Sequence, residues 1–113
     1  MAHGYVEAWT HGDRARALDL IGPGATVEWN LALPADVPTL VDALTRLAAA
    51  STAVRLTGET YTADRAALVY DCTAPGGTVR TIEFLAVADG RIREIRQVYD
   101  VTALRRLLPG VLD

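Results

Sequence analysis

Glu83 is the residue in this sequence with the clearest capacity for chemistry. It lies in the largely apolar segment 78–88, where residues two apart point to the same face of a strand, so it would share a face with Val79 and Leu85. A carboxyl group among apolar neighbours loses hydration, which raises its pKa. Such an acid can donate a proton to an epoxide, a carbonyl or an enol. The alternative is that Glu83 pairs with an arginine or lies at a solvated edge of a pocket.

Asp71 is the second candidate for acid–base catalysis. Its segment, 65–73, should pair with the Glu83 strand through the turn at 75–77, so both carboxyls could lie on one face of a sheet. Two carboxyls in one low-dielectric site take different pKa values, and one then acts as acid and the other as base. Epoxide opening and aldol-type cyclisation need that arrangement. The phase of the strand stays open, because Tyr70 and its alternate neighbours could equally face inward and turn Asp71 outward.

Six further side chains are expected to line the pocket around Glu83. They are Tyr5 as a third catalytic candidate, and Trp29, Leu85, Ile95, Gln97 and Tyr99 as substrate-binding candidates. Tyr5 could donate a hydrogen bond from the first helix, although an aromatic residue there is more often part of a core. Gln97 and Tyr99 could orient a polar group of the substrate or could form a wet rim. Trp29 would form an apolar or stacking wall.

Composition and charge argue against several classes of function. The net charge of −3 argues against nucleic acid as a partner. No apolar run reaches the ~20 residues of a membrane span, and residues 1–4 lack the features of a signal peptide, so we expect no membrane and a cytoplasmic location. His3 and His11 have no matching acids for a metal site, so we expect no metal and no cofactor. All eleven basic residues are arginine, which suggests a GC-rich bacterial source.

The elements that must position these side chains follow from periodicity and turn residues. Helices are expected at 4–11, 14–21, 36–50 and 101–108, and strands at 25–31, 54–62, 65–73, 78–88 and 91–100. Helices followed by a run of strands predict one α+β domain over 1–113 with an antiparallel meander. The segment 78–88 is apolar on both faces. We therefore expect helices on one face and a second copy of the chain on the other, as a homodimer.

Several segments resemble a known superfamily when they are taken in order. Residues 5–13, YVEAWTHGD, resemble the opening signature of ketosteroid isomerases and SnoaL-like proteins, in which an aromatic precedes the Asp of a Gly-Asp turn by eight residues. Residues 25–29 resemble the first strand of these proteins, and 81–85 with 89–100 resemble their last hairpin. The chain therefore resembles the SnoaL-like branch of the ketosteroid isomerase superfamily, also called nuclear transport factor two-like.

This resemblance implies a cone-shaped α+β barrel, in which three helices pack on a curved antiparallel sheet around a concave pocket. It also implies a homodimer whose sheets meet by their convex faces. It places Tyr5 at the position of the oxyanion tyrosine and Glu83 at that of the acid. Trp29 stands at the position of the catalytic base, and Trp cannot accept a proton. This departure argues against steroid isomerisation by the family's mechanism.

These observations predict a cofactor-independent cyclase or isomerase. Its substrate would be a small, mostly apolar molecule of polyketide or terpenoid type, bound in a hydrophobic pocket with Glu83 and Asp71 moving protons. An epoxide hydrolase is an alternative, and so is a non-catalytic module for binding small molecules or for dimerisation. An enzyme should place a second polar group within reach of Glu83, whereas a module should fill the cavity with side chains.

Overall fold

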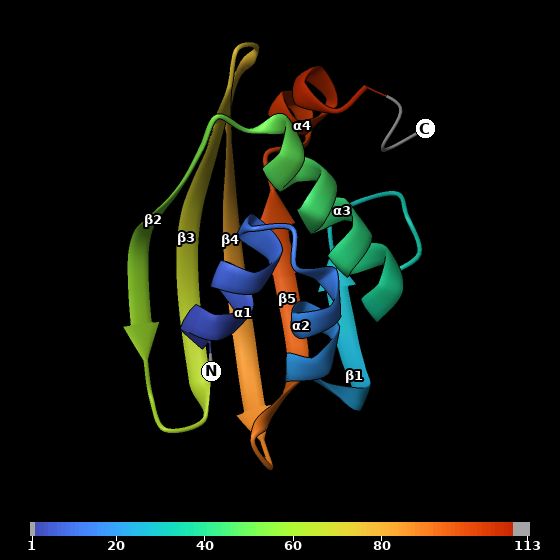
Figure 1. The fold of residues 1–113 in the computed structure, drawn as a ribbon, viewed down its shortest axis with the longest axis vertical. Helices are drawn as coiled ribbons and strands as arrows, with labels where there is room; N and C mark the ends of the chain where they lie inside the picture. The colour runs from blue at the N-terminus through green and yellow to red at the C-terminus, as the bar shows by residue number, and fades with distance from the viewer. Residues whose placement is uncertain (1, 110–113) are drawn as a thin grey trace.

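The computed structural model describes residues 2–109, which form four helices and one five-stranded sheet (Figure 1). The helices are α1 (Ala2–Thr10), α2 (Arg14–Leu20), α3 (Val37–Ala50) and α4 (Val101–Leu107). The strands are β1 (Ile21–Trp29), β2 (Ala53–Tyr61), β3 (Arg65–Ala74), β4 (Gly77–Ala88) and β5 (Arg91–Tyr99). Among the described residues, no helix has the length and apolar character needed to cross a membrane.

Aspartate side chains begin three of the helices. Asp13, Asp36 and Asp100 each accept a hydrogen bond from the backbone N–H three residues later, at the first turn of α2, α3 and α4. A carboxylate in this position satisfies a backbone donor that has no partner within the helix. These caps determine where each helix starts.

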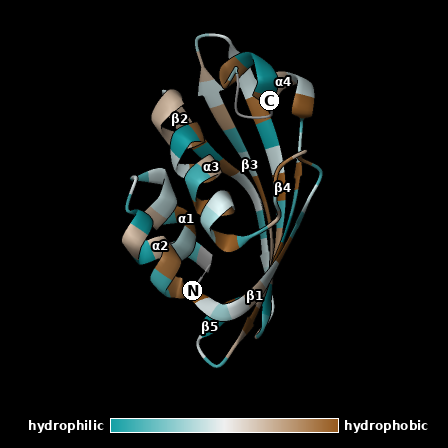
Figure 2. Ribbon diagram, turned by 90° about the vertical axis from the view of Figure 1, so that its right-hand side faces the viewer, coloured by the Kyte–Doolittle hydropathy of each residue, from teal (hydrophilic) through white to brown (hydrophobic). Residues whose placement is uncertain are grey.

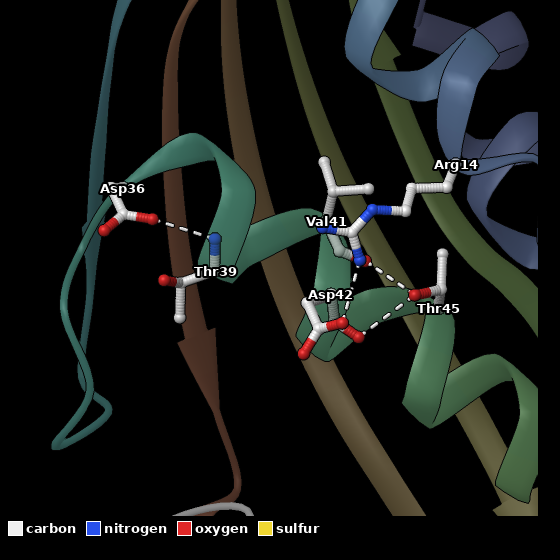
Figure 3. Close-up of polar contacts among 6 residues, drawn as sticks. All are labelled: Arg14, Asp36, Thr39, Val41, Asp42 and Thr45. Carbon is white, nitrogen blue, oxygen red and sulfur yellow. Dashed lines mark hydrogen bonds and ion pairs between the residues drawn. The ribbon is translucent and has the colours of Figure 1, made fainter.

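An ion pair joins α2 to α3 on the outside of the helical layer (Figure 3). The Arg14 guanidinium at the start of α2 donates to a carboxylate oxygen of Asp42 in α3 at 2.8 Å. One turn further along α3, the Thr45 hydroxyl donates to the backbone carbonyls of Val41 and Asp42. Both charged side chains are about half exposed, so the pair contributes less than about 1 kcal/mol. The buried stripe of α3 holds that helix on the sheet: Leu40, Val41, Leu44 and Leu47.

The sheet has the strand order β1-β5-β4-β3-β2. Strands β2 to β5 form the expected antiparallel meander, whereas β1 pairs parallel with β5. The α+β fold is therefore confirmed, with a sheet that is mixed and open rather than wholly antiparallel or closed into a barrel. The chain leaves β1 at one edge of the sheet and returns through α3 to β2 at the opposite edge, as Figure 1 shows.

Strand β1 starts earlier than the sequence suggests. The segment Gly22-Pro23-Gly24 reads as a break between helix and strand, yet it lies inside β1. Proline has no N–H to donate, and it is tolerated here because β1 is an edge strand whose pairing with β5 is irregular between Ile21 and Thr26. Gly24 takes a φ of +78°, which only glycine adopts without strain.

Helices α1, α2 and α3 lie together on one side of the sheet, and α4 lies at its upper end (Figures 1 and 2). We call the covered side the inner face; on β4 it carries Val79, Thr81, Glu83 and Leu85, all buried. The opposite side is the outer face; on β4 it carries Arg80, Ile82, Phe84 and Ala86. Ile82 and Val98 of the outer face are 51% and 56% exposed. The core therefore lies between the inner face and α1, α2 and α3, and the homodimer through the outer face remains a prediction.

Candidate active site

Glu83 lies in the middle of the inner face and is completely buried. Its strand is the central one of the sheet, and its partners in register are Leu68 on β3 and Gln97 on β5. Alternation along β4 points the side chain at the helices, as the sequence indicates. A carboxyl group is thus held in the interior, closed off from solvent.

One oxygen of this carboxyl is anchored by two donors. Glu83 Oε2 accepts a hydrogen bond of 3.1 Å from the Tyr5 hydroxyl of α1 and another from Nε2 of Gln97. Gln97 in turn accepts at its Oε1 from the Tyr99 hydroxyl at 2.6 Å. The structure therefore brings together four of the residues that the sequence places in the site, in a chain running from α1 to β4 and β5.

The other oxygen, Glu83 Oε1, is buried and has no hydrogen-bond partner among the described residues. A buried polar atom without a partner is uncommon in folded proteins, because it loses its hydrogen bonds to water. Anchoring at Oε2 fixes the orientation of the carboxyl group. Oε1 is thus the atom at which Glu83 can exchange a proton with a bound molecule.

Burial raises the pKa of Glu83 from 4.5 to about 7, and the hydrogen bonds from Gln97 and Tyr5 oppose that rise. Burial also raises the pKa of Tyr5 and of Tyr99 well above the usual value of 10, with the Glu83 charge adding to the effect. Both tyrosines therefore stay protonated and act as donors. An acid whose pKa lies near neutrality can take up and return a proton under physiological conditions.

Asp71 does not join this site, which corrects the expectation that the two acids share a face. Its strand turns Leu68, Tyr70 and Cys72 inward, so Asp71 points to the outer side. There Arg80 holds it with two hydrogen bonds, from Nε to Oδ1 at 2.8 Å and from Nη2 to Oδ2 at 2.9 Å. These bonds lower the pKa of Asp71. The hydrophobic positions of β3 decide this phase, because a shift by one residue would expose all of them.

The remaining predicted lining residues lie on the inner side in two different settings. Leu85 and Ile95 are completely buried in the core, as register partners on β4 and β5. Trp29 ends the edge strand β1 opposite Gln97 and is half-buried. Its indole N–H donates to the backbone carbonyl of Leu33 at 3.2 Å. Trp29 thus lies beside Gln97, on the adjacent edge strand of the inner face.

Two polar residues of the inner face were missed by the sequence reasoning about the site. Tyr70 on β3 and Thr81 on β4 are register partners, and both are completely buried. Thr81 precedes Glu83 by two residues, so the alternation that turns Glu83 inward was the signal available for it. Tyr70 could not be found in that way, because the phase of its strand was open.

Access to Glu83 is closed in this structure. Glu83 lines none of five surface hollows with volumes between 220 and 420 Å³, although Trp29 and Gln97 line one of about 260 Å³. Tyr5 on α1 binds Glu83 directly, so α1 lies over the carboxyl group. A substrate reaches Glu83 only when this helical cover moves. Within residues 2–109, no cluster of three or more His, Cys, Asp or Glu side chains could hold a metal ion.

Comparisons with known proteins find matches among solved structures. No family model and no curated protein matches the sequence. A protein from Kribbella flavida is 23% identical with a TM-score of 0.78, over 94% of this chain and 88% of that one. An NTF2-like protein from Cytophaga hutchinsonii is 12% identical with a TM-score of 0.72, over 91% and 89%.

A steroid delta-isomerase from Pseudomonas aeruginosa is 17% identical with a TM-score of 0.69, over 93% of this chain and 79% of that one. Identities this low carry the fold and not the reaction. The shared architecture includes the curved open sheet and the helical layer on its inner face. The chain therefore has the NTF2-like fold that the resemblance in its sequence implies, and it shares this fold with a steroid delta-isomerase.

Proposed function

We propose that the protein is an enzyme that moves a proton within a small, mostly apolar substrate, as an isomerase or a cyclase does, with Glu83 as acid and base. The observation that carries this proposal is the state of the Glu83 carboxyl: one oxygen is anchored by Tyr5 and Gln97, and the other is buried and unpartnered. A carboxyl with a pKa of about 7 populates both protonation states near neutral pH.

The proposed reaction needs no second acid. Ionised Glu83 Oε1 removes a proton from a carbon next to a carbonyl group, and the electron pair of the broken C–H bond moves to the carbonyl oxygen as an enolate forms. The neutral acid then returns the same proton to another carbon, or the enolate attacks a second carbonyl within the substrate and closes a ring, in which case Glu83 protonates the alkoxide. Gln97 on the neighbouring strand keeps the carboxyl oriented throughout.

A steroid delta-isomerase shares this fold, so isomerisation is the first reaction to test. Trp29 on the edge strand supplies no base, so Glu83 must carry out both proton transfers. Epoxide hydrolysis is less well supported, because a second acid at Asp71 faces the other side of the sheet. Polyketide-like and terpenoid-like ketones remain the substrates to try first.

The test is deuterium incorporation next to the carbonyl of apolar ketones in heavy water, followed by NMR. We expect the wild-type protein to accelerate exchange in at least one ketone of a panel. Glu83→Gln should lose about 100-fold or more of that acceleration. Glu94→Gln, an acid paired with Arg96 on the outer side, is the matched control and should keep it. Equal exchange by wild type and Glu83→Gln would contradict the proposal.

A non-catalytic binding module is the second candidate, and one observation favours it. Glu83, Gln97 and Tyr5 are almost completely closed off from solvent, as in a filled core. On this alternative the protein binds a small molecule without converting it. It would then show saturable binding of apolar ketones and no deuterium incorporation into any of them.

We also propose that two copies of the chain pair through the outer face. Ile82 and Val98 are large apolar side chains exposed there. Charged side chains of both signs lie on the same face, including Arg96, which pairs with Glu28 and Glu94. Two identical faces can therefore meet without net repulsion. Sedimentation velocity should show a dimer for the wild type and a monomer for Ile82→Arg. A monomeric wild-type protein would contradict the pairing.

A further inference from the structure

Four polar atoms on the inner side of the molecule are buried and have no hydrogen-bond partner among residues 2–109. They are Trp9 Nε1, Tyr70 Oη, Thr81 Oγ1 and Glu83 Oε1. All four side chains are completely buried. A folded protein can tolerate a single buried polar atom without a partner. Here four such atoms lie on neighbouring elements, at the place of the proposed reaction.

These side chains are neighbours in the sheet and in the helix above it. Tyr70 and Thr81 are partners across β3 and β4, and Thr81 lies two residues before Glu83 on the same face. The Trp9 ring of α1 packs on the Tyr70 ring with centroids 5.2 Å apart. Burial raises the pKa of Tyr70 well above its usual value, and the Glu83 charge adds to the rise, so this hydroxyl stays a donor.

The charge of the surroundings limits what this group of side chains can bind. All eleven arginines are exposed, and so are His3 and His11, so no cation of the described chain lies inside the core. A carboxylate or a phosphate brought into this interior would lack a countercharge and would face Glu83 itself. A neutral molecule with oxygen functions matches the hydroxyls of Tyr70 and Thr81.

We propose that Tyr70 and Thr81 form a second polar subsite beside Glu83 that binds an oxygen of the substrate other than the one at the reacting centre. The substrate is then a neutral molecule with two oxygen functions, such as a hydroxyketone or a diketone, on an apolar frame. Tyr70 and Thr81 donate to the second oxygen while Glu83 Oε1 handles the proton. This inference rests on the proposed function, since it assigns the substrate class of the same site.

A first test uses the stability of the protein without ligand. Removing an unpartnered buried hydroxyl removes a desolvation penalty, so Tyr70→Phe and Thr81→Val should each raise the unfolding midpoint by about 4 °C. Tyr61→Phe and Thr78→Val are matched controls at exposed positions and should shift it far less. A lower midpoint for both inner-face variants would overturn the proposal, because it would mean that each hydroxyl has a partner inside the protein.

A second test measures binding through tryptophan fluorescence, with 2-naphthol and a set of naphthalenediols that differ in the spacing of their hydroxyls. We expect at least one diol to bind about tenfold more tightly than 2-naphthol, as one added hydrogen bond of about 1.4 kcal/mol implies. Tyr70→Phe and Thr81→Val should remove that preference and leave the affinity for 2-naphthol unchanged. The controls Tyr61→Phe and Thr78→Val should keep the preference.

Two outcomes overturn the subsite: no diol binds more tightly than 2-naphthol, or neither kind of probe binds. The preference for a diol, lost in both inner-face variants, supports it. Failure of the proposed function gives a different result, because a protein that selects the diol but never exchanges deuterium into ketones has the subsite without the reaction. A protein that exchanges deuterium in a Glu83-dependent way but does not prefer a diol would have the reaction without the subsite.

Discussion

Glu83 and Asp71 are acids on adjacent strands of one sheet, and their surroundings give them opposite properties. Glu83 faces the helices, and burial raises its pKa to about 7. Asp71 faces the other side, and the Arg80 guanidinium lowers its pKa. The two strands are hydrogen-bonded partners. Asp71 on β3 is in register with Arg80 on β4, and Arg80 lies three residues before Glu83. The face of the sheet, rather than the type of residue, therefore decides which carboxyl can exchange protons near neutral pH.

The two carboxyls also differ in how completely they are satisfied. Both oxygens of Asp71 accept from one exposed arginine, whereas only one oxygen of Glu83 has donors. A fully paired surface carboxylate contributes little to stability and has no free atom for chemistry. A half-paired buried carboxyl destabilises the fold when it is ionised, and such destabilisation is typical of functional sites.

The largest expected effect is on the pH dependence of stability. Below pH 4.5 Glu83 is protonated in both the folded and the unfolded state, so it adds nothing; between 4.5 and about 7 only the unfolded state releases the proton. The free energy of unfolding should therefore fall by about 3 kcal/mol across this window as pH rises, and stay level above it. Urea unfolding gives the free energy of unfolding of the wild type and of Glu83→Gln at each pH, and the difference between the two measures the effect. A difference that does not change with pH would contradict the prediction.

The next effect concerns Gln97, which links Glu83 to Tyr99. Gln97→Leu removes a donor from the carboxyl and an acceptor from the tyrosine, and should cost about 2 kcal/mol of stability at pH 5. The loss should be greater at pH 8, because the Gln97 hydrogen bond stabilises the ionised form of Glu83. Chemical denaturation at both pH values tests this, and an equal loss at the two would mean that the bond does not favour the charge.

Tyr5→Phe should have a smaller effect, about 1 kcal/mol, since it removes one hydrogen bond to a carboxyl that keeps another. The pKa of Glu83 should rise further, because the Tyr5 hydroxyl lowers it. NMR titration of the Glu83 side-chain carboxyl carbon measures the shift. Tyr61→Phe at an exposed position is the control and should leave that titration where it is.

The smallest effect is expected on the outer face. Asp71→Asn breaks the ion pair with the exposed Arg80 and should lower stability by less than about 1 kcal/mol, and by still less in high salt. Deuterium exchange should not change. A large loss of exchange in this variant would erase the contrast between the two acids and restore the two-acid mechanism.

Much of the fold could be predicted from the sequence, because it rests on local signals. Asp13, Asp36 and Asp100 mark helix starts through hydrogen bonds that span three residues. The alternation of 78–88 turns Glu83 inward without any knowledge of its neighbours. The start of β1 was not foreseen, because Pro23 is compatible with a strand only at an edge, and the edge is a property of the whole sheet.

The sequence by itself determined the order of the elements, their caps, and the presence of an acid on an apolar face. Only the tertiary structure decided that Asp71 lies outside, that β1 runs parallel to β5, and that a single oxygen of Glu83 is anchored. The physical reason is distance along the chain. Tyr5 and Glu83 are 78 residues apart, so the bond that orients the carboxyl exists only after α1 packs on the sheet.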